Sequence, residues 1–178
     1  MGRNILKYGV IAGLIVAAGM WGTLLAFGRE MPHGWPGMAL GYLSMLVALS
    51  AVFVGIKHHR DVDRGGVIRF WPAFGLGLGI SLVAGIFYVL AWELAQATVV
   101  GDFAGHYAAG TIAQAKASGA DAAELATLTA QMEAFKRQYA DPLFRLPMTF
   151  AEVFPVGVLV SLVSAAVLRN PRVLPARH

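Results

Sequence analysis

Long stretches without a charged residue determine the fold class of this chain. An α-helix needs about 20 apolar residues to cross a bilayer core of about 30 Å. Three uncharged stretches are that long, and they cover residues 8–27, 37–56 and 70–92. A fourth stretch, residues 147–168, contains one acid, Glu152, and one internal proline, Pro155. The sequence therefore predicts an all-α integral membrane bundle of four transmembrane helices, forming a single membrane domain over residues 1–178.

The composition agrees with a lipid environment. Hydrophobic residues make up 57% of the 178 residues and charged residues only 13%, whereas soluble domains carry about 25% charged residues. Because the chain has no cysteine, it cannot carry a disulfide or a thiolate nucleophile. The first stretch is longer than the roughly 7–15 apolar residues of a signal peptide, and no clear cleavage site follows it. We therefore expect an uncleaved membrane anchor.

Lysine and arginine are distributed unequally between the two predicted faces of the membrane. The face that includes both termini carries Arg3, Lys7, Lys57, Arg60, Arg64, Arg69, Arg169, Arg172 and Arg177. The other face carries Arg29, Lys116, Lys136, Arg137 and Arg145. By the positive-inside rule both termini should be cytoplasmic, with Trp71 at the inner interface and Trp35 and Trp92 at the outer one. We expect the basic cytoplasmic loop to meet anionic lipid, and we expect no nucleic-acid partner.

The segment between the third and fourth spans, residues 102–141, is too long and too regular for a plain loop. Asp102 can cap a first helix that ends near Ser118, with Gly119 suited to a left-handed position. Asp121 and Glu124 have the spacing of a capping box for a second helix. That helix carries an apolar stripe of Leu125, Leu128, Met132, Phe135 and Tyr139. We predict an extracytoplasmic helical hairpin whose stripe packs on its own partner helix, or else on the bilayer or a second protomer.

Several short segments also resemble one known family. They are GYLSM (41–45), FVGIK (53–57), RD (60–61), GGVI (65–68), AF (73–74), FY and AW (87–88 and 91–92), DF with Y (102–103 and 107), FPVG (154–157) and SLVSA (161–165). Together they resemble the bacterial membrane family known as domain of unknown function 4199, in the same order and over roughly residues 7–169. The resemblance implies four spans in a bacterial cytoplasmic membrane and no established chemistry. The chain departs from the family at His59, where an aromatic residue is expected.

Two acids lie in or near the predicted spans, and an ionisable group inside a membrane is by default a candidate functional site. Glu93 follows Arg69 by 24 residues, about 36 Å of helix, which exceeds the bilayer core and places Glu93 at the outer interface. Glu152 precedes Arg169 by 17 residues, about 25 Å, which places it just inside the outer boundary. Glu152 is the stronger candidate.

The two acids could share a polar pocket with Arg145 or His106, because the hairpin joins their spans antiparallel. In the functional interpretation, Glu93, Glu152 and Arg145 form a proton or cation site near a kink at Pro155, whose freed carbonyl could also face it. In the structural interpretation, which we favour, Glu93 is solvated and Glu152 caps the fourth helix or pairs with Arg145.

Four potential metal ligands lie in the predicted cytoplasmic loop: His58, His59, Asp61 and Asp63. Adjacent histidines point to different sides, and the loop lacks the H-x-x-x-H type of spacing found in zinc sites. We therefore expect a solvated basic loop that faces lipid, with neither a metal nor a cofactor.

Small residues recur at a spacing of four in every predicted span. They are Gly9, Gly13 and Ala17, then Gly37 and Gly41, then Gly75 and Gly79, then Gly157 and Ser161. This spacing lets membrane helices approach closely, and we favour packing within the monomer over a dimer face. Gly75, Gly77 and Gly79 are not the start of a dinucleotide-binding motif, because no soluble strand precedes them.

The sequence leaves three function classes open. We favour a non-enzymatic membrane scaffold or accessory protein that contacts a protein partner, or a second copy of itself, through the hairpin. The alternative is a small oligomeric transporter or channel that uses Glu152 and possibly Glu93. A membrane enzyme acting on lipid or quinone is the least favoured class, since no nucleophile and base motif supports it.

Overall fold

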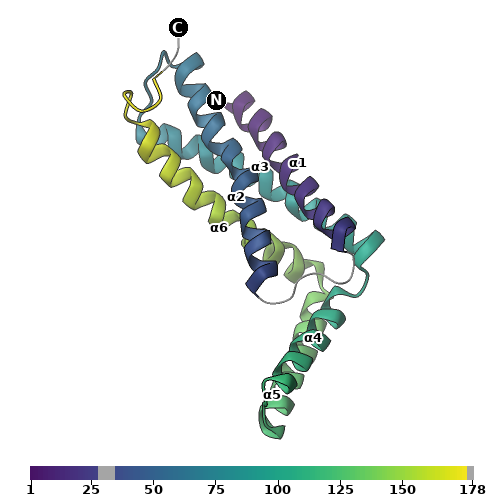
Figure 1. Ribbon diagram of the computed structural model, residues 1–178. Coiled ribbons are helices and arrows are strands. Elements are labelled where there is room, and N and C mark those ends of the chain that lie inside the picture. The colour runs from purple at the N-terminus through teal and green to yellow at the C-terminus, as the bar shows by residue number, and fades with distance from the viewer. Residues whose placement is uncertain (28–34, 176–178) are drawn as a thin grey trace. The chain divides into compact units, whose positions relative to one another are not determined.

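The computed structural model describes residues 1–27 and 35–175 (Figure 1). Its helices are α1 (Gly2–Phe27), α2 (Trp35–His58), α3 (Phe70–Ala95), α4 (Phe103–Ala117), α5 (Ala122–Tyr139) and α6 (Pro142–Leu168). Two π-helical turns extend α2 and α3, namely η1 (His59–Asp63) and η2 (Gln96–Val100). The sequence-based roles of Arg29, Arg177 and the Trp35 side chain lie outside what the structure describes.

The prediction of an all-helical chain with four candidate spans is confirmed. Over residues 1–27 and 35–175 the chain forms helices and turns and no β-strand. Four helical segments are long and apolar enough to cross a membrane, and they correspond to α1, α2 with η1, α3 with η2, and α6. The helices are longer than the apolar stretches, since α1 and α6 begin before them while α2 and α3 continue past them.

The fourth long helix begins at Pro142, five residues before the fourth apolar stretch. Proline is well suited to the first position of a helix, where its missing N–H has no intrahelical partner in any case. The Asp141 carboxylate completes this start by accepting a hydrogen bond from the Leu143 amide at 2.9 Å. Pro142 therefore both ends the hairpin and starts α6.

The chain forms two compact units, one of residues 1–92 with residues 150 onwards, and one of residues 93–149. In the first unit, parts of α1, α2, α3 and α6 pack around one apolar core. Its buried members include Tyr8, Leu49, Val52, Ile56, Leu76, Ile80, Val153 and Leu168.

The outward faces of the first unit are apolar. Exposed aliphatic side chains include Leu6, Leu14, Leu43, Leu90 and Leu159. Polar side chains are instead found inside, among them Asn4, Arg60, Ser81, Ser161 and Ser164. Soluble proteins rarely expose so much contiguous apolar surface. This distribution suits a bundle whose outer face is covered by lipid.

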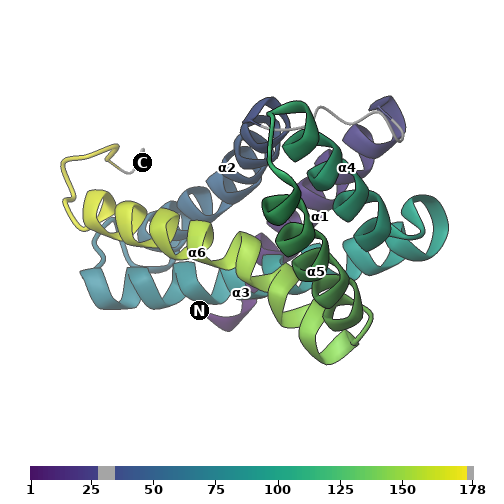
Figure 2. The same cartoon turned by 90° about the horizontal axis from the view of Figure 1, so that it is seen from below.

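Helices α3 and α6 lie side by side (Figure 2) and approach closely at two glycine and serine pairs. A Cβ atom added at Gly77 would lie 2.7 Å from Ser161, and one added at Gly157 would lie 2.6 Å from Ser81. The two serine hydroxyls meet at 3.2 Å in the interior. The pair Gly157 and Ser161 was predicted from its spacing, whereas Gly77 and Ser81, also four residues apart, were not.

Gly79 of α3 faces α1, whereas Gly85 faces Phe150 of α6. A Cβ at Gly79 would lie 2.7 Å from Ile5, while the α1 residues Gly9 and Gly13 leave room for Val83 and Phe87. Helix α3 therefore carries two faces of small residues, one for α1 and one for α6. These contacts agree with the prediction of packing within the monomer for Gly9, Gly13, Gly79, Gly157 and Ser161. A Cβ at Gly41 would meet nothing within 4 Å, and the surroundings of Gly37 lie outside what the structure describes.

The second unit contains the helical hairpin of α4 and α5, which run side by side in Figures 1 and 2. The predicted caps are present. The Asp102 carboxylate accepts from the Gly105 amide, Gly119 has a φ of 83°, and Asp121 and Glu124 form a capping box. In the apolar stripe of α5, Phe135 contacts Tyr107 and Tyr139 contacts Phe103, with ring centroids 5.7 and 5.5 Å apart. This part of the stripe packs on its hairpin partner, as predicted.

Candidate functional site

The π-helical turn η1 at the end of α2 is the most connected polar region of the first unit. Wider than an α-helical turn, it turns two consecutive residues, His59 and Arg60, into the interior. Such π-turns are rare and often found at functional sites. The turn ends where the Gly66 amide donates to the Arg60 carbonyl at 2.8 Å.

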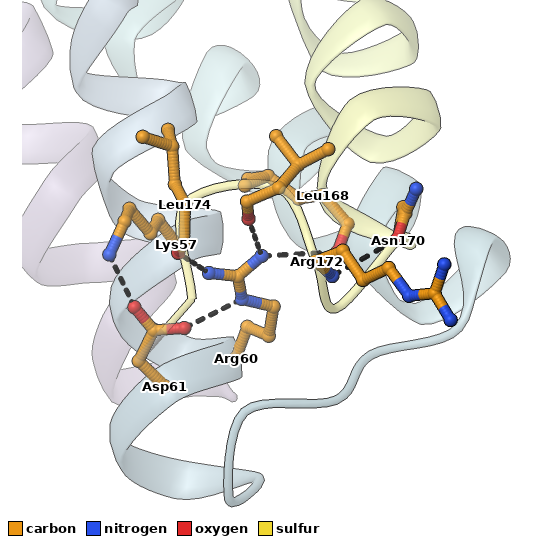
Figure 3. Close-up of polar contacts among 8 residues, drawn as sticks. Lys57, Arg60, Asp61, Leu168, Asn170, Arg172 and Leu174 are labelled. Atoms are coloured by element: carbon orange, nitrogen blue, oxygen red, sulfur yellow. Dashed lines mark hydrogen bonds and ion pairs between the residues drawn. The ribbon is translucent and has the colours of Figure 1, made fainter. Parts of the chain in front are cut away.

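Arg60 joins η1 to the C-terminal end of α6. Its side chain is fully buried, and its Nη1 atom donates to the Val173 carbonyl at 2.9 Å and, more weakly, to the Leu168 carbonyl at 3.5 Å. The Nη2 atom donates to the Leu174 carbonyl (Figure 3). Carbonyls at a helix C-terminus have no intrahelical partner, so Arg60 caps α6 and holds the segment that follows it.

The charge of Arg60 is balanced by Asp61. The Arg60 Nε atom donates to one Asp61 oxygen at 2.6 Å, and the Lys57 ammonium donates to the other (Figure 3). One carboxylate therefore lies between two cations. This arrangement leaves the cluster of Lys57, Arg60 and Asp61 with a net positive charge.

His59 joins η1 to the start of α1. Its Nδ1 atom lies 2.7 Å from Asp63 Oδ2, and the Asn4 amide nitrogen donates to the same oxygen at 2.7 Å. Because a carboxylate only accepts, His59 Nδ1 donates in this contact. The Nε2 atom is buried and has no hydrogen-bond partner among the described residues.

The prediction of a solvated loop is wrong for His59 and Arg60, which are 3% and 0% exposed. The helix continues past Lys57 as η1, and this continuation turns both side chains inward. Arg64 and Arg69, in contrast, are exposed as expected. Within the part of the chain that the structure describes, no group of three or more His, Asp or Glu side chains could hold a metal ion.

Of the predicted site residues, Glu93 and Arg145 are brought together in the second unit. The Arg145 Nε and Nη2 atoms donate to the two Glu93 oxygens at 2.8 and 2.7 Å. Arg145 also donates to the Tyr139 carbonyl at 3.2 Å, and its guanidinium lies 5.8 Å from the Tyr139 ring centroid. This bidentate ion pair links the end of α3 to the start of α6. The expectation that Glu93 is simply solvated is therefore wrong. Pairing of Arg145 with Glu152 stays a prediction.

Glu152 belongs to the first unit, where the Tyr88 hydroxyl donates to it at 3.0 Å. It does not cap α6, because the helix has already begun at Pro142. The helix also continues without interruption through Pro155. His106, proposed as a possible neighbour of the acids, has its Nδ1 atom 2.6 Å from the Asp102 carbonyl in the first turn of its own helix.

Two shallow grooves lie on the first unit. One has a volume of about 240 Å³ and is lined by Tyr8, Val54, Lys57, His58, Asp61 and Val62. The other, of about 250 Å³, is lined by Ile15, Gly19, Leu43, Ser44 and Val47. The first combines aliphatic and charged side chains, whereas the second is almost entirely apolar.

Comparison with known proteins gives one match. The model of a family described as "Protein of unknown function (DUF4199)" matches residues 7–170. No curated protein and no solved structure has significant similarity to the chain.

Proposed function

We propose, from the premise that this chain belongs to the DUF4199 family of proteins of unknown function, that it is a non-enzymatic scaffold or accessory protein of a membrane. Family membership confirms the resemblance seen in the sequence and specifies no activity. The proposal therefore rests on what the polar side chains do.

The observation that carries this proposal is that the candidate polar groups join helices to one another. Arg60 binds the end of α6 and the segment after it, His59 and Asp63 bind α1 through Asn4, and Glu93 binds Arg145. Such contacts support a rigid, close-packed membrane protein. A protein of this kind acts through its surface.

We place the protein in the bacterial cytoplasmic membrane, with both termini in the cytoplasm and the hairpin outside. This orientation is supported by the basic residues at the ends of α1, α2, α3 and α6 that belong to one predicted face. Exposed cations on that face include Arg3, Lys7, Arg64, Arg69 and Arg169.

The contact surface that we propose lies on the second unit. Tyr107 on α4 is 51% exposed and Leu143 at the start of α6 is 84% exposed. Exposed aromatic and large aliphatic side chains are typical anchors of protein interfaces. A protein partner or a second copy of the chain would bind there.

The test places a photo-crosslinking residue at Tyr107 or Leu143 in growing cells. The matched control carries the same residue at Leu159, which is 60% exposed on the apolar face of α6. We expect a protein adduct from at least one of the first two positions and none from the control. Adducts from neither position would remove the hairpin as a contact surface.

The alternative function is a small oligomeric transporter or channel, and the Glu152 and Tyr88 pair is the observation that favours it. A carboxylate in the outer part of a predicted span, bound to a single tyrosine hydroxyl among the described contacts, could exchange a proton or a cation. Transport predicts that Glu152→Gln abolishes flux in proteoliposomes while the protein remains folded. Absence of flux in the unaltered protein would remove this alternative.

A further inference from the structure

The groove lined by Tyr8 from α1 and by one face of α2 and η1 changes in polarity along its length. Val54, Lys57, His58 and Asp61 follow one another at helical spacing, so they share that face. Val54 is 51% exposed and lies within the predicted span, while Lys57 follows directly after the span. The groove therefore runs from an aliphatic end to a charged end.

The charged end of the groove is cationic although it contains an acid. Both oxygens of Asp61 are occupied, one by Lys57 and the other by the buried Arg60 (Figure 3). The Lys7 ammonium lies 5.3 Å from the centroid of the Tyr8 ring that lines the groove. Two lysines and one arginine thus outweigh one carboxylate.

We infer that this groove binds an anionic glycerophospholipid, with the phosphate at Lys7 and Lys57 and an acyl chain along Val54. A phospholipid changes in polarity in the same order, with apolar acyl chains followed by a charged phosphate. Its headgroup lies at the depth where a transmembrane helix ends. Free inorganic phosphate would make no use of the aliphatic end. This inference rests on the placement of the bundle in a membrane and is independent of any partner of the hairpin.

Native mass spectrometry of the detergent-purified protein tests the inference by titration with phosphatidylglycerol or phosphatidylcholine. The double variant Lys7→Gln with Lys57→Gln should bind phosphatidylglycerol roughly 30-fold more weakly. Each lysine near an anionic lipid contributes about 1 kcal/mol, and about 2 kcal/mol in total corresponds to that factor in affinity. The control, Arg64→Gln with Arg172→Gln, removes the same charge from exposed residues outside the groove. It should bind almost as tightly as the unaltered protein.

A second pair of variants keeps the test valid if the loss of Lys57 impairs folding. Val62→Glu places a carboxylate in the groove, and Val67→Glu places one outside it; these valines are 67% and 58% exposed. Only Val62→Glu should weaken binding. Equal losses in test and control variants, equal binding of phosphatidylcholine, or displacement of the lipid by millimolar inorganic phosphate would each overturn the inference. None of these results depends on crosslinking through the hairpin.

Discussion

At the scale of single residues, Arg60 is the side chain with the largest structural role. A buried guanidinium requires partners for its five donors, and η1 and the segment after α6 provide one carboxylate and three carbonyl oxygens. The same guanidinium also provides a donor for the last carbonyl of α6, that of Leu168, which has no partner within the helix.

We expect Arg60→Ala to lower the free energy of unfolding by about 3 kcal/mol, because it leaves Asp61 and the carbonyls of Leu168, Val173 and Leu174 without their buried partner. Arg64→Ala is the matched control, an exposed arginine four residues away, and should stay within about 0.5 kcal/mol. Thermal unfolding in detergent micelles measures both. Equal midpoints for the two variants would contradict the structural role of Arg60.

The ion pair of Glu93 and Arg145 is the second residue-scale feature that can be tested. Both side chains are partly exposed, at 29% and 17%, so a double-mutant cycle with Glu93→Gln and Arg145→Gln should give a coupling of about 1 kcal/mol. The more exposed pair of Glu133 and Lys136, within α5, should give only about 0.3 kcal/mol. Similar coupling energies for the two pairs would mean that the bidentate geometry of Glu93 and Arg145 adds no stability.

The sequence predicts which residues are unusual better than it predicts their partners. Glu93, Arg145 and Glu152 stand out because charges are rare near apolar stretches. Their pairing depends on helix rotation, which differs by about 100° for each residue and cannot be obtained from spacing across a long insertion. His59 and Arg60 were misassigned because nothing in the local sequence indicates that α2 ends in a π-turn.

At the scale of helices, close approach in the first unit depends on small residues at the contact points, beside a core of large aliphatic side chains. Packing, not exclusion from water, drives helix association in lipid. The four spans were recognisable because length and apolarity alone define them. The face of α3 that meets α6 was not, since Gly75, Gly77 and Gly79 all lie within one short stretch and only the fold assigns them to different neighbours.

Replacing Gly157 by valine tests this packing. A Cβ at Gly157 would lie 2.6 Å from Ser81, so α3 and α6 must separate, and we expect a loss of about 1–3 kcal/mol of stability. Gly22→Val is the control, because a Cβ at Gly22 meets nothing within 4 Å. Thermal unfolding should show a lower midpoint for Gly157→Val alone. Unchanged stability of that variant would mean that the two helices are not in close contact.

At the scale of the whole molecule, the proposed orientation follows from charge rather than from any single contact. Cations at the ends of four helices favour the anionic inner leaflet, and both acids of η1 are engaged with η1, α1 or Lys57. The four basic residues Lys57, Arg60, Arg64 and Arg69 outnumber these two acids, so this end of α2 keeps a net positive charge. The lipid inference and the orientation share this physical basis, and a single measurement of topology bears on both.

The absence of cysteine allows the orientation to be tested with single introduced cysteines. Arg64 and Ser118 are both exposed, one directly after η1 and the other at the turn between α4 and α5. In intact cells a membrane-impermeant maleimide should label Ser118→Cys, and it should label Arg64→Cys only after the membrane is permeabilised. Labelling of both positions without permeabilisation would mean that they share the outer face, which an odd number of spans between them cannot produce. Labelling of Arg64→Cys alone would invert the topology and move the basic helix ends to the outer leaflet, where the positive-inside rule no longer accounts for the charge distribution.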